Sequence, residues 1–205
     1  MASSTSRQPL EALRIDPVVA LRSATHALHE QLERSLPLGR LTATLADYCT
    51  HLTVRRDWQQ ILGPWLARTT LDPAAMDFLE QDLIDCLVPP SIHALDAPPA
   101  LPAPDLAALR RLGDGRAGFC WGIAYVVEGS RLSGQVLYRR LAQQLALHFL
   151  RYLSQCGSSS PSWPEMLACL RARLATDFEV ELACGGAVAA FELLLLRFKH
   201  AGCIA

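Results

Sequence analysis

The fold of this chain depends most on the segment Gly122-Ile123-Ala124-Tyr125-Val126-Val127-Glu128-Gly129-Ser130-Arg131-Leu132-Ser133-Gly134-Gln135. It lies between two apolar segments with helical spacing, yet it carries three glycines and two serines where a helix favours alanine or leucine. Each glycine inside a helix costs about 0.5–1 kcal/mol relative to alanine. The repeated glycines therefore indicate that this backbone approaches a neighbour closely. That neighbour is either another helix or a flat ligand lying against a kinked helix.

Length and composition are typical of one packed globular domain. The chain has 205 residues, of which 51% are hydrophobic and 19% charged, enough for a sizeable core. The net charge of −1 gives no reason to expect nucleic acid as a partner. No apolar run reaches the roughly 18 residues of a membrane span, and the first residues lack the hydrophobic centre of a signal peptide. We therefore expect a cytoplasmic protein with no membrane partner.

The seven cysteines are odd in number, widely scattered and without a C-x-x-C pair. Disulfide frameworks and structural zinc sites both need closely organised cysteines. The pattern instead predicts reduced, mostly buried thiols.

Apolar residues recur at helical spacing along most of the chain, and no alternation typical of strands is present, so the predicted class is all-α. Asp16 and Pro17 predict a helix start, as cap and first helical residue, for a helix that ends before Pro37 and Gly39. A second long helix is expected over 41–67. A shorter third helix follows Asp72-Pro73, with its apolar residues between 76 and 87, and is closed by Pro89-Pro90.

Further along the chain, residues 89–104 predict a connecting loop and 105–112 a short helix. Apolar spacing then predicts one helix through 136–153 and a last long helix from about Pro164 to Phe198, with a kink at Gly185-Gly186. We therefore expect an N-terminal tail at 1–15, one helical domain at 16–200 and a C-terminal tail at 201–205.

The first predicted helix carries Arg22, His26, His29 and Glu33. Positions i and i+4 share a helix face, so Glu33 is expected beside the His29 ring, with Arg22 two turns earlier on that stripe. A histidine between leucines, with a carboxylate one turn further on, suits an axial metal ligand. The alternative is that both histidines are surface or satisfied core residues.

Two segments resemble a known family. Residues 21–33, Leu-Arg-Ser-Ala-Thr-His-Ala-Leu-His-Glu-Gln-Leu-Glu, resemble the proximal helix of haem oxygenases, whose pattern is L-[KR]-x-A-T-x-x-x-H-x-x-x-E. Residues 125–134, Tyr-Val-Val-Glu-Gly-Ser-Arg-Leu-Ser-Gly, are similar to the distal helix of the bacterial form, Y-V-x-E-G-S-x-L-G-[GA]. The segments occur in the family's order. The resemblance extends over residues 17–198 and is sparse outside these two motifs.

The resemblance implies a single-domain, multi-helix haem oxygenase-like fold with a kinked distal helix. By position, His29 matches the proximal ligand of the haem iron and Glu33 the carboxylate that supports it. Arg22 matches a basic residue near the haem propionates. His26 matches no role, and for it we expect an exposed or partly buried helix residue.

On the distal helix, Gly129 and Gly134 match positions whose missing side chains let the backbone approach haem and its bound oxygen. Ser130 matches a polar position that helps to order distal water. Ser133 departs from the family, which usually has glycine there. Its side chain adds bulk and a hydroxyl to the distal wall, which would narrow the pocket, turn the haem or hydrogen-bond a ligand.

Several other residues carry two interpretations each. Tyr125 either offers its phenol to a propionate or packs as an ordinary aromatic residue. Arg171 and Arg173 either pair with propionates or form a solvated face. Phe191 either lines the haem pocket or belongs to the core. Three further pairs either dock an acidic electron donor or are solvated: Arg55-Arg56, Arg110-Arg111 and Arg139-Arg140.

The implied activity is that of a haem oxygenase, an oxidoreductase that converts haem to biliverdin, CO and Fe²⁺. Haem is both substrate and cofactor, and an external ferredoxin or flavin reductase supplies electrons for O₂ chemistry. Two alternatives stay open: a non-degrading haem carrier or sensor of the same fold, and a helical interaction domain without a cofactor.

Overall fold

The computed structural model describes residues 15–40, 42–69, 75–87, 116–145, 150–156 and 162–204. Within these ranges the chain forms helices and no strand, which confirms the all-α prediction. The elements are α1 (Pro17–Ser35), η1 (Pro37–Gly39), α2 (Leu45–Leu66), α3 (Ala75–Leu87), α5 (Ala117–Leu141), α6 (Arg151–Gln155), α7 (Trp163–Arg173) and α8 (Asp177–His200). The expected loop at 89–104, the expected helix at 105–112 and all but the last residue of the expected N-terminal tail lie outside the described residues.

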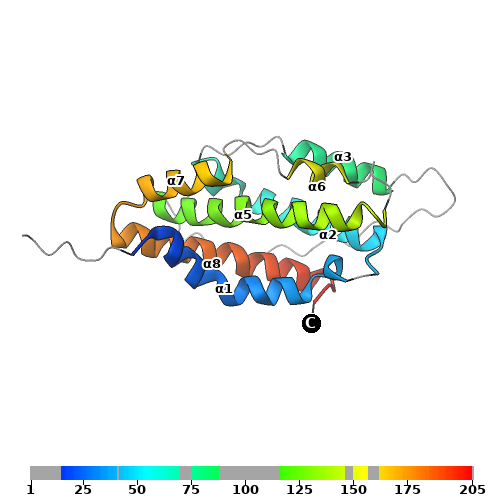
Figure 1. Ribbon diagram of the computed structural model, residues 1–205, viewed down its shortest axis with the longest axis horizontal. Coiled ribbons are helices and arrows are strands. Elements are labelled where there is room, and N and C mark those ends of the chain that lie inside the picture. The colour runs from blue at the N-terminus through cyan, green and yellow to red at the C-terminus, as the bar shows by residue number, and fades with distance from the viewer. Residues whose placement is uncertain are drawn as a thin grey trace, which may run out of the picture.

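Two long helices, α5 and α8, pack against each other at the centre of the molecule. α1 lies along α8 on one side, and α2 contacts both central helices (Figure 1). The shorter helices α7 and α6 contact α5 from the other side, with α3 packed beside α6. The core is therefore built between helices that are distant in sequence.

Side-chain caps fix where the helices begin. Asp16 accepts a hydrogen bond from the Val18 amide at 2.7 Å, so α1 starts where the sequence predicts. Three further helices begin with capping boxes. In each, the side chain of the cap residue accepts from the backbone amide three residues later, and the acidic side chain of that later residue accepts from the backbone amide of the cap. The pairs are Thr44 with Asp47, Ser162 with Glu165, and Thr176 with Glu179.

The centre of the fold is a backbone-to-backbone crossing of α5 and α8. A Cβ atom added to Gly122 would overlap the Ala183 carbonyl oxygen, and one added to Gly186 would overlap that of Phe119. On Gly118 it would lie 2.7 Å from the Glu179 carbonyl oxygen. For these glycines, close helix packing is the reason for the missing side chain.

Two helix boundaries differ from the sequence prediction. The helix expected through 136–153 is divided, because α5 ends at Leu141 and α6 begins at Arg151. The last long helix is also divided, but between α7 and α8 rather than at Gly185-Gly186, which lie inside an uninterrupted helix. The Thr176–Glu179 capping box starts α8, and apolar spacing does not reveal such a local signal. Residues 122–135 lie within α5, which is also uninterrupted.

We expect Gly122→Ala to lower the free energy of unfolding by about 1–3 kcal/mol, because its methyl group displaces the backbone of α8. The matched control is Gly185→Ala, where an added Cβ meets nothing within 4 Å. That variant should be neutral or more stable by up to about 1 kcal/mol, from helix propensity. Urea unfolding of both variants measures the difference, and equal effects would contradict the assigned crossing.

Candidate functional site

A cavity of about 500 Å³ lies beside the central crossing, with α1 and α8 on one side and α5 on the other. α2, α6 and α7 complete its walls. Its size falls in the range of about 300–1,000 Å³ that is usual for small-molecule and cofactor sites. Most of its lining is apolar, with a small number of charged and polar groups.

Most of the residues that the sequence nominated for the site line this cavity. They come from three helices: Arg22, His29, Glu33, Tyr125, Gly129, Ser130, Ser133, Gly134 and Phe191. Arg171 and Arg173 do not: Arg173 is exposed, and Arg171 Nε donates to Asp16 Oδ2 at 2.7 Å. This ion pair joins α7 to the cap of α1 and lowers the pKa of the Asp16 carboxyl.

His29 stands on the α1 wall of the cavity. Its Nδ1 lies 3.5 Å from Glu33 Oε1, the neighbour predicted from the i, i+4 spacing, and 47% of its side chain is exposed. Its ring meets Phe191 of α8 edge-on, with centroids 5.9 Å apart. Because the two ring nitrogens lie on opposite sides of the imidazole, the contact with Glu33 leaves Nε2 for a ligand.

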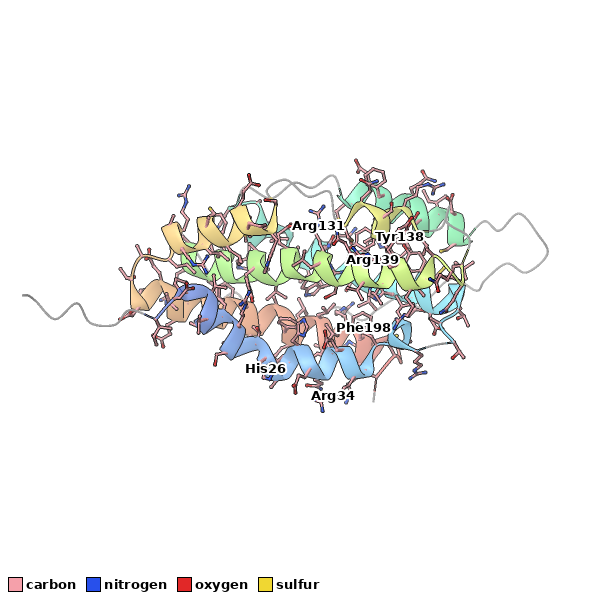
Figure 2. The ribbon with its side chains drawn as sticks, in the orientation of Figure 1. His26, Arg34, Arg131, Tyr138, Arg139 and Phe198 are labelled. Atoms are coloured by element: carbon pink, nitrogen blue, oxygen red, sulfur yellow. The ribbon has the colours of Figure 1, made fainter. Side chains whose placement is uncertain are left out.

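His26 lies on a different face of the same helix. Its side chain is 73% exposed and lies 3.4 Å from Glu30. Figure 2 shows it on the outer side of α1, together with Arg34, whereas Phe198 points into the molecule. The exposed position expected for His26 is confirmed.

The two motif glycines of α5 have different surroundings. A Cβ atom on Gly134 would lie 2.6 Å from Cys156 Sγ, so this glycine is needed for packing beside α6. A Cβ atom on Gly129 would meet only the Trp163 ring, at 3.4 Å. Gly129 is therefore not required by tight packing and lines the cavity, while Gly134 lets the helix approach its neighbour. The side chain of Ser133 is exposed at the same wall.

Arg55 is a cavity residue for which the sequence analysis expected a surface role. It is only 4% exposed, and its Nη2 donates to Ser130 Oγ at 2.6 Å and to the Tyr152 hydroxyl at 3.3 Å. Its guanidinium lies 4.6 Å from the centre of the buried Trp58 ring. The docking interpretation is thus wrong for Arg55. The signal that identifies it is its place on the buried stripe of α2, three residues after Leu52 and three before Trp58.

The other basic pairs have separate outcomes. Arg139 is exposed (Figure 2), but Arg140 turns toward the cavity and its Nη1 donates to the Gly39 carbonyl at 2.8 Å. Nε and Nη2 of Arg140 are buried without a hydrogen-bond partner in the described part of the chain. The pair Arg110-Arg111 lies outside the described residues.

His51 is a second cavity histidine that the sequence analysis missed. It is 7% exposed, packs 5.5 Å from the Phe198 ring, and its Nδ1 has no hydrogen-bond partner among the described residues. Burial, together with the nearby Arg55 guanidinium, lowers the pKa of His51 to about 3. The imidazole is therefore uncharged at neutral pH.

The charged groups of the cavity favour an anionic ligand. Of the described residues, three arginines line it, Arg22, Arg55 and Arg140, against one carboxylate, Glu33. Burial raises the pKa of Tyr125, and the Arg22 guanidinium beside it partly offsets that effect. Arginine pairs well with carboxylates because its planar guanidinium offers several donors.

No protein-family model matches this sequence, and no curated protein matches it. Among the described residues, no three His, Cys, Asp or Glu side chains form a group that could hold a bare metal ion. None of the described helices combines the length and apolar character of a membrane span.

We expect His51 to make the stability of the protein depend on pH. The unfolded chain protonates a histidine near pH 6.5, whereas the folded chain resists protonation down to about pH 3. The neutral His51 therefore contributes fully to the free energy of unfolding above about pH 6.5, and this contribution is lost as the pH falls. The free energy of unfolding should fall by about 2 kcal/mol between pH 7 and pH 5. Urea unfolding at both pH values measures it.

Replacement by His51→Phe should remove this part of the pH dependence. The control His26→Phe changes an exposed histidine and should leave the dependence as in the wild type. Parallel pH profiles for the wild type and His51→Phe would show that His51 is not held neutral by burial.

Proposed function

We propose that this protein is a haem oxygenase that cleaves haem, with O₂ and electrons from an external ferredoxin or flavin reductase, to biliverdin, CO and Fe²⁺. The proposal is carried by one observation. A histidine motif and a glycine-rich motif that are far apart in sequence, and that resemble the two halves of a haem site, line the same cavity.

The residues of the cavity suit haem in polarity. Haem is a flat apolar ring with two carboxylates, and the cavity combines an apolar lining with three arginines. At the same cavity, Leu132 is 38% and Val136 68% exposed on α5, so an apolar ligand would cover side chains that now face solvent. Gly129 lines the cavity without a side chain, beside the Trp163 ring, so a planar group could approach the α5 backbone there.

The residues on the two walls have different tasks. Nε2 of His29 would hold the iron, while Glu33 beside Nδ1 fixes the orientation of the imidazole. Arg22 and Tyr125 would bind the propionates at their part of the cavity. The ring of Phe191 limits the movement of the His29 imidazole. Bound haem supplies the ring to be opened and the iron at which O₂ is reduced.

The α5 wall contributes backbone access and polar groups. Ser130 and Arg55 present a hydrogen-bonded pair there, held by a contact of 2.6 Å. The neutral His51 and the buried rings of Phe191 and Phe198 limit the entry of bulk water on the α8 side. Because Arg55, His51 and Tyr152 are buried on that side, hydrogen bonds among these groups are stronger than in water.

A non-degrading haem carrier or sensor is the second candidate, and the position of Ser133 favours it. This serine lines the cavity at a position where the resembled family usually has glycine. Adding ascorbate or a reductase to the haem complex in air separates the two functions. Loss of the Soret band with growth of biliverdin absorption supports the enzyme, whereas a stable spectrum supports the carrier.

The third alternative, a helical interaction domain without a cofactor, has its own support. Gly122 and Gly186 are explained by helix packing alone. Failure of the wild-type protein to bind haem stoichiometrically would favour this alternative over both haem functions.

We expect His29→Ala to remove the absorption spectrum of histidine-ligated haem and to stop turnover, because no imidazole would then hold the iron from α1. Glu33→Gln should keep the histidine-ligated spectrum and weaken haem binding by about tenfold, as loss of a supporting partner usually does. Haem titration followed by visible absorption measures both effects. His26→Ala is the control, and an unchanged spectrum for His29→Ala would show that the ligand assignment is wrong.

We expect Ser133→Gly to change the rate or the position of ring opening, because the substitution removes a hydroxyl and its bulk from the cavity wall. Single-turnover assays with analysis of the biliverdin isomers measure both quantities. Ser23→Gly, at an exposed position of α1, is the control. It measures the loss of stability, about 0.5–1 kcal/mol, that follows from placing a glycine in a helix. If neither the rate nor the isomer changes, the departure from the family pattern is neutral.

A further inference from the structure

We propose that Tyr152 is the hydrogen-bond donor that faces a small ligand on the α5 side of the cavity, and that Arg55 and Ser130 are positioning residues. The inference deepens the proposed haem function and rests on it. It assigns the donor role to a short helix outside both sequence motifs.

The hydroxyl proton of Ser130 is already used. Ser130 Oγ donates to the Val127 carbonyl at 2.5 Å and accepts from Arg55 Nη2 at 2.6 Å. A hydroxyl has one proton, so this serine has none left to offer a ligand. Ser130 can still accept a hydrogen bond, but it cannot be the donor.

Arg55 is held in place from two sides. Its guanidinium lies 4.6 Å from the centre of the Trp58 ring, and Trp58 is fully buried, with its Nε1 donating to the Ala190 carbonyl at 2.9 Å. On the other side, Arg55 Nη2 reaches both Ser130 and the Tyr152 hydroxyl, the latter at 3.3 Å. Arg55 thus acts as a fixed donor to these two oxygens.

Tyr152 has an unused proton. Its hydroxyl oxygen accepts from Arg55 at 3.3 Å and from Gln59 Nε2 at 3.5 Å. A phenol oxygen has one proton besides its acceptor positions. When both nitrogen donors occupy the acceptor side, the proton points away from them. Within the described part of the chain it meets no acceptor, and Tyr152 is 2% exposed and lines the cavity.

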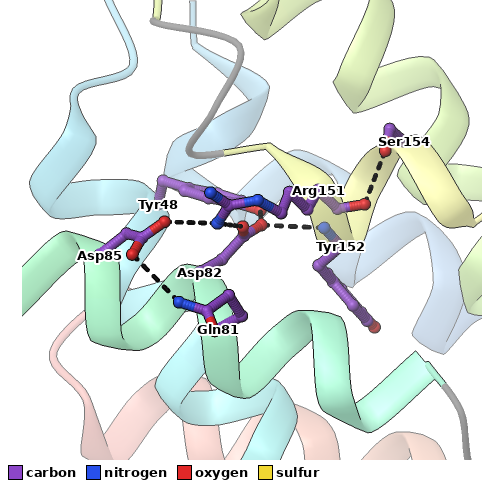
Figure 3. Close-up of polar contacts among 7 residues, drawn as sticks. All are labelled: Tyr48, Gln81, Asp82, Asp85, Arg151, Tyr152 and Ser154. Carbon is purple, nitrogen blue, oxygen red and sulfur yellow. Dashed lines mark hydrogen bonds and ion pairs between the residues drawn. The ribbon is translucent and has the colours of Figure 1, made fainter.

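The backbone of Tyr152 is anchored at the start of α6 (Figure 3). Its amide donates to Asp82 Oδ2 at 2.8 Å, and the Tyr48 hydroxyl donates to the same oxygen at 2.9 Å. Arg151 adds ion pairs to Asp82, at 3.4 Å, and to Asp85. In Figure 3 the Tyr152 side chain extends away from these carboxylates. A helix of five residues is thereby tied to α2 and α3, which keeps the phenol in place.

Fluoride binding to the ferric haem complex of the full-length chain tests the assignment without turnover, because a bound anion is stabilised by a nearby donor. We expect Tyr152→Phe to lower fluoride affinity by about tenfold, the loss of one hydrogen bond to a charged acceptor. Haem affinity and the midpoint of thermal unfolding should stay close to those of the wild type. Visible absorption during titration at pH 7 measures the affinities.

Three variants complete the experiment. Ser130→Ala should lose less fluoride affinity than Tyr152→Phe, since it removes a positioning contact and not the donor. His51→Phe should have no more than a twofold effect. Tyr138→Phe is the matched control, because Tyr138 lies on α5 but does not line the cavity. A larger loss for Ser130→Ala or His51→Phe than for Tyr152→Phe would overturn the assignment.

Failure of the two proposals can be told apart. If the wild type binds haem and His29→Ala removes the histidine-ligated spectrum, but Tyr152→Phe leaves fluoride affinity unchanged, only the donor assignment is wrong. If the wild type does not bind haem, the proposed function and the donor assignment are both wrong.

Discussion

The close crossing of α5 and α8 is the constraint on which the rest of the structure depends. Gly122 lies against Ala183, and Phe119 lies against Gly186, with only backbone between the two helices. The two helices run in the same direction through this crossing (Figure 1). Beyond the crossing, the larger side chains of both helices line the cavity. The same pair of helices therefore provides the tightest packing in the centre and the open space beside it.

α1 completes the cavity because it packs along α8 rather than along α5. This arrangement places His29 against Phe191 and leaves the α5 backbone on the facing wall. The glycines of the segment at 122–135 differ in their surroundings. Close helix packing accounts for Gly122 and Gly134, whereas Gly129 faces the Trp163 ring at the cavity. The ligand interpretation of the segment stays a proposal that concerns Gly129.

The buried polar groups of the cavity lower the stability of the fold. A buried imidazole nitrogen without a partner, as in His51, carries the desolvation cost of an unsatisfied polar group. Arg55 is a buried charge whose described partners are two hydroxyl oxygens and an aromatic ring. Groups of this kind are concentrated at functional sites. Their position around one cavity, next to the motif residues, is the reason we place binding there rather than elsewhere on the surface.

The sequence by itself determined the features that depend on neighbours a few residues apart. These are the helical class, the start of α1 at the Asp16 cap, and the adjacency of His29 and Glu33 across one helical turn. Helical periodicity and capping act over three or four residues, so they can be derived from a single sequence. The separate α6 and the start of α8 at Thr176 were missed, because apolar spacing continues across both breaks.

Only the tertiary structure decided which distant residues meet. The stripe of α2 indicates that Arg55 is buried, but no local pattern specifies that it meets Ser130, that Arg171 pairs with Asp16, or that Tyr152 reaches the cavity from a short helix. These contacts depend on how whole helices pack, and the crossing at Gly122 sets that packing through a backbone contact between residues about sixty positions apart. The sequence named the chemical groups of a site, and the packing of the helices placed them around one cavity.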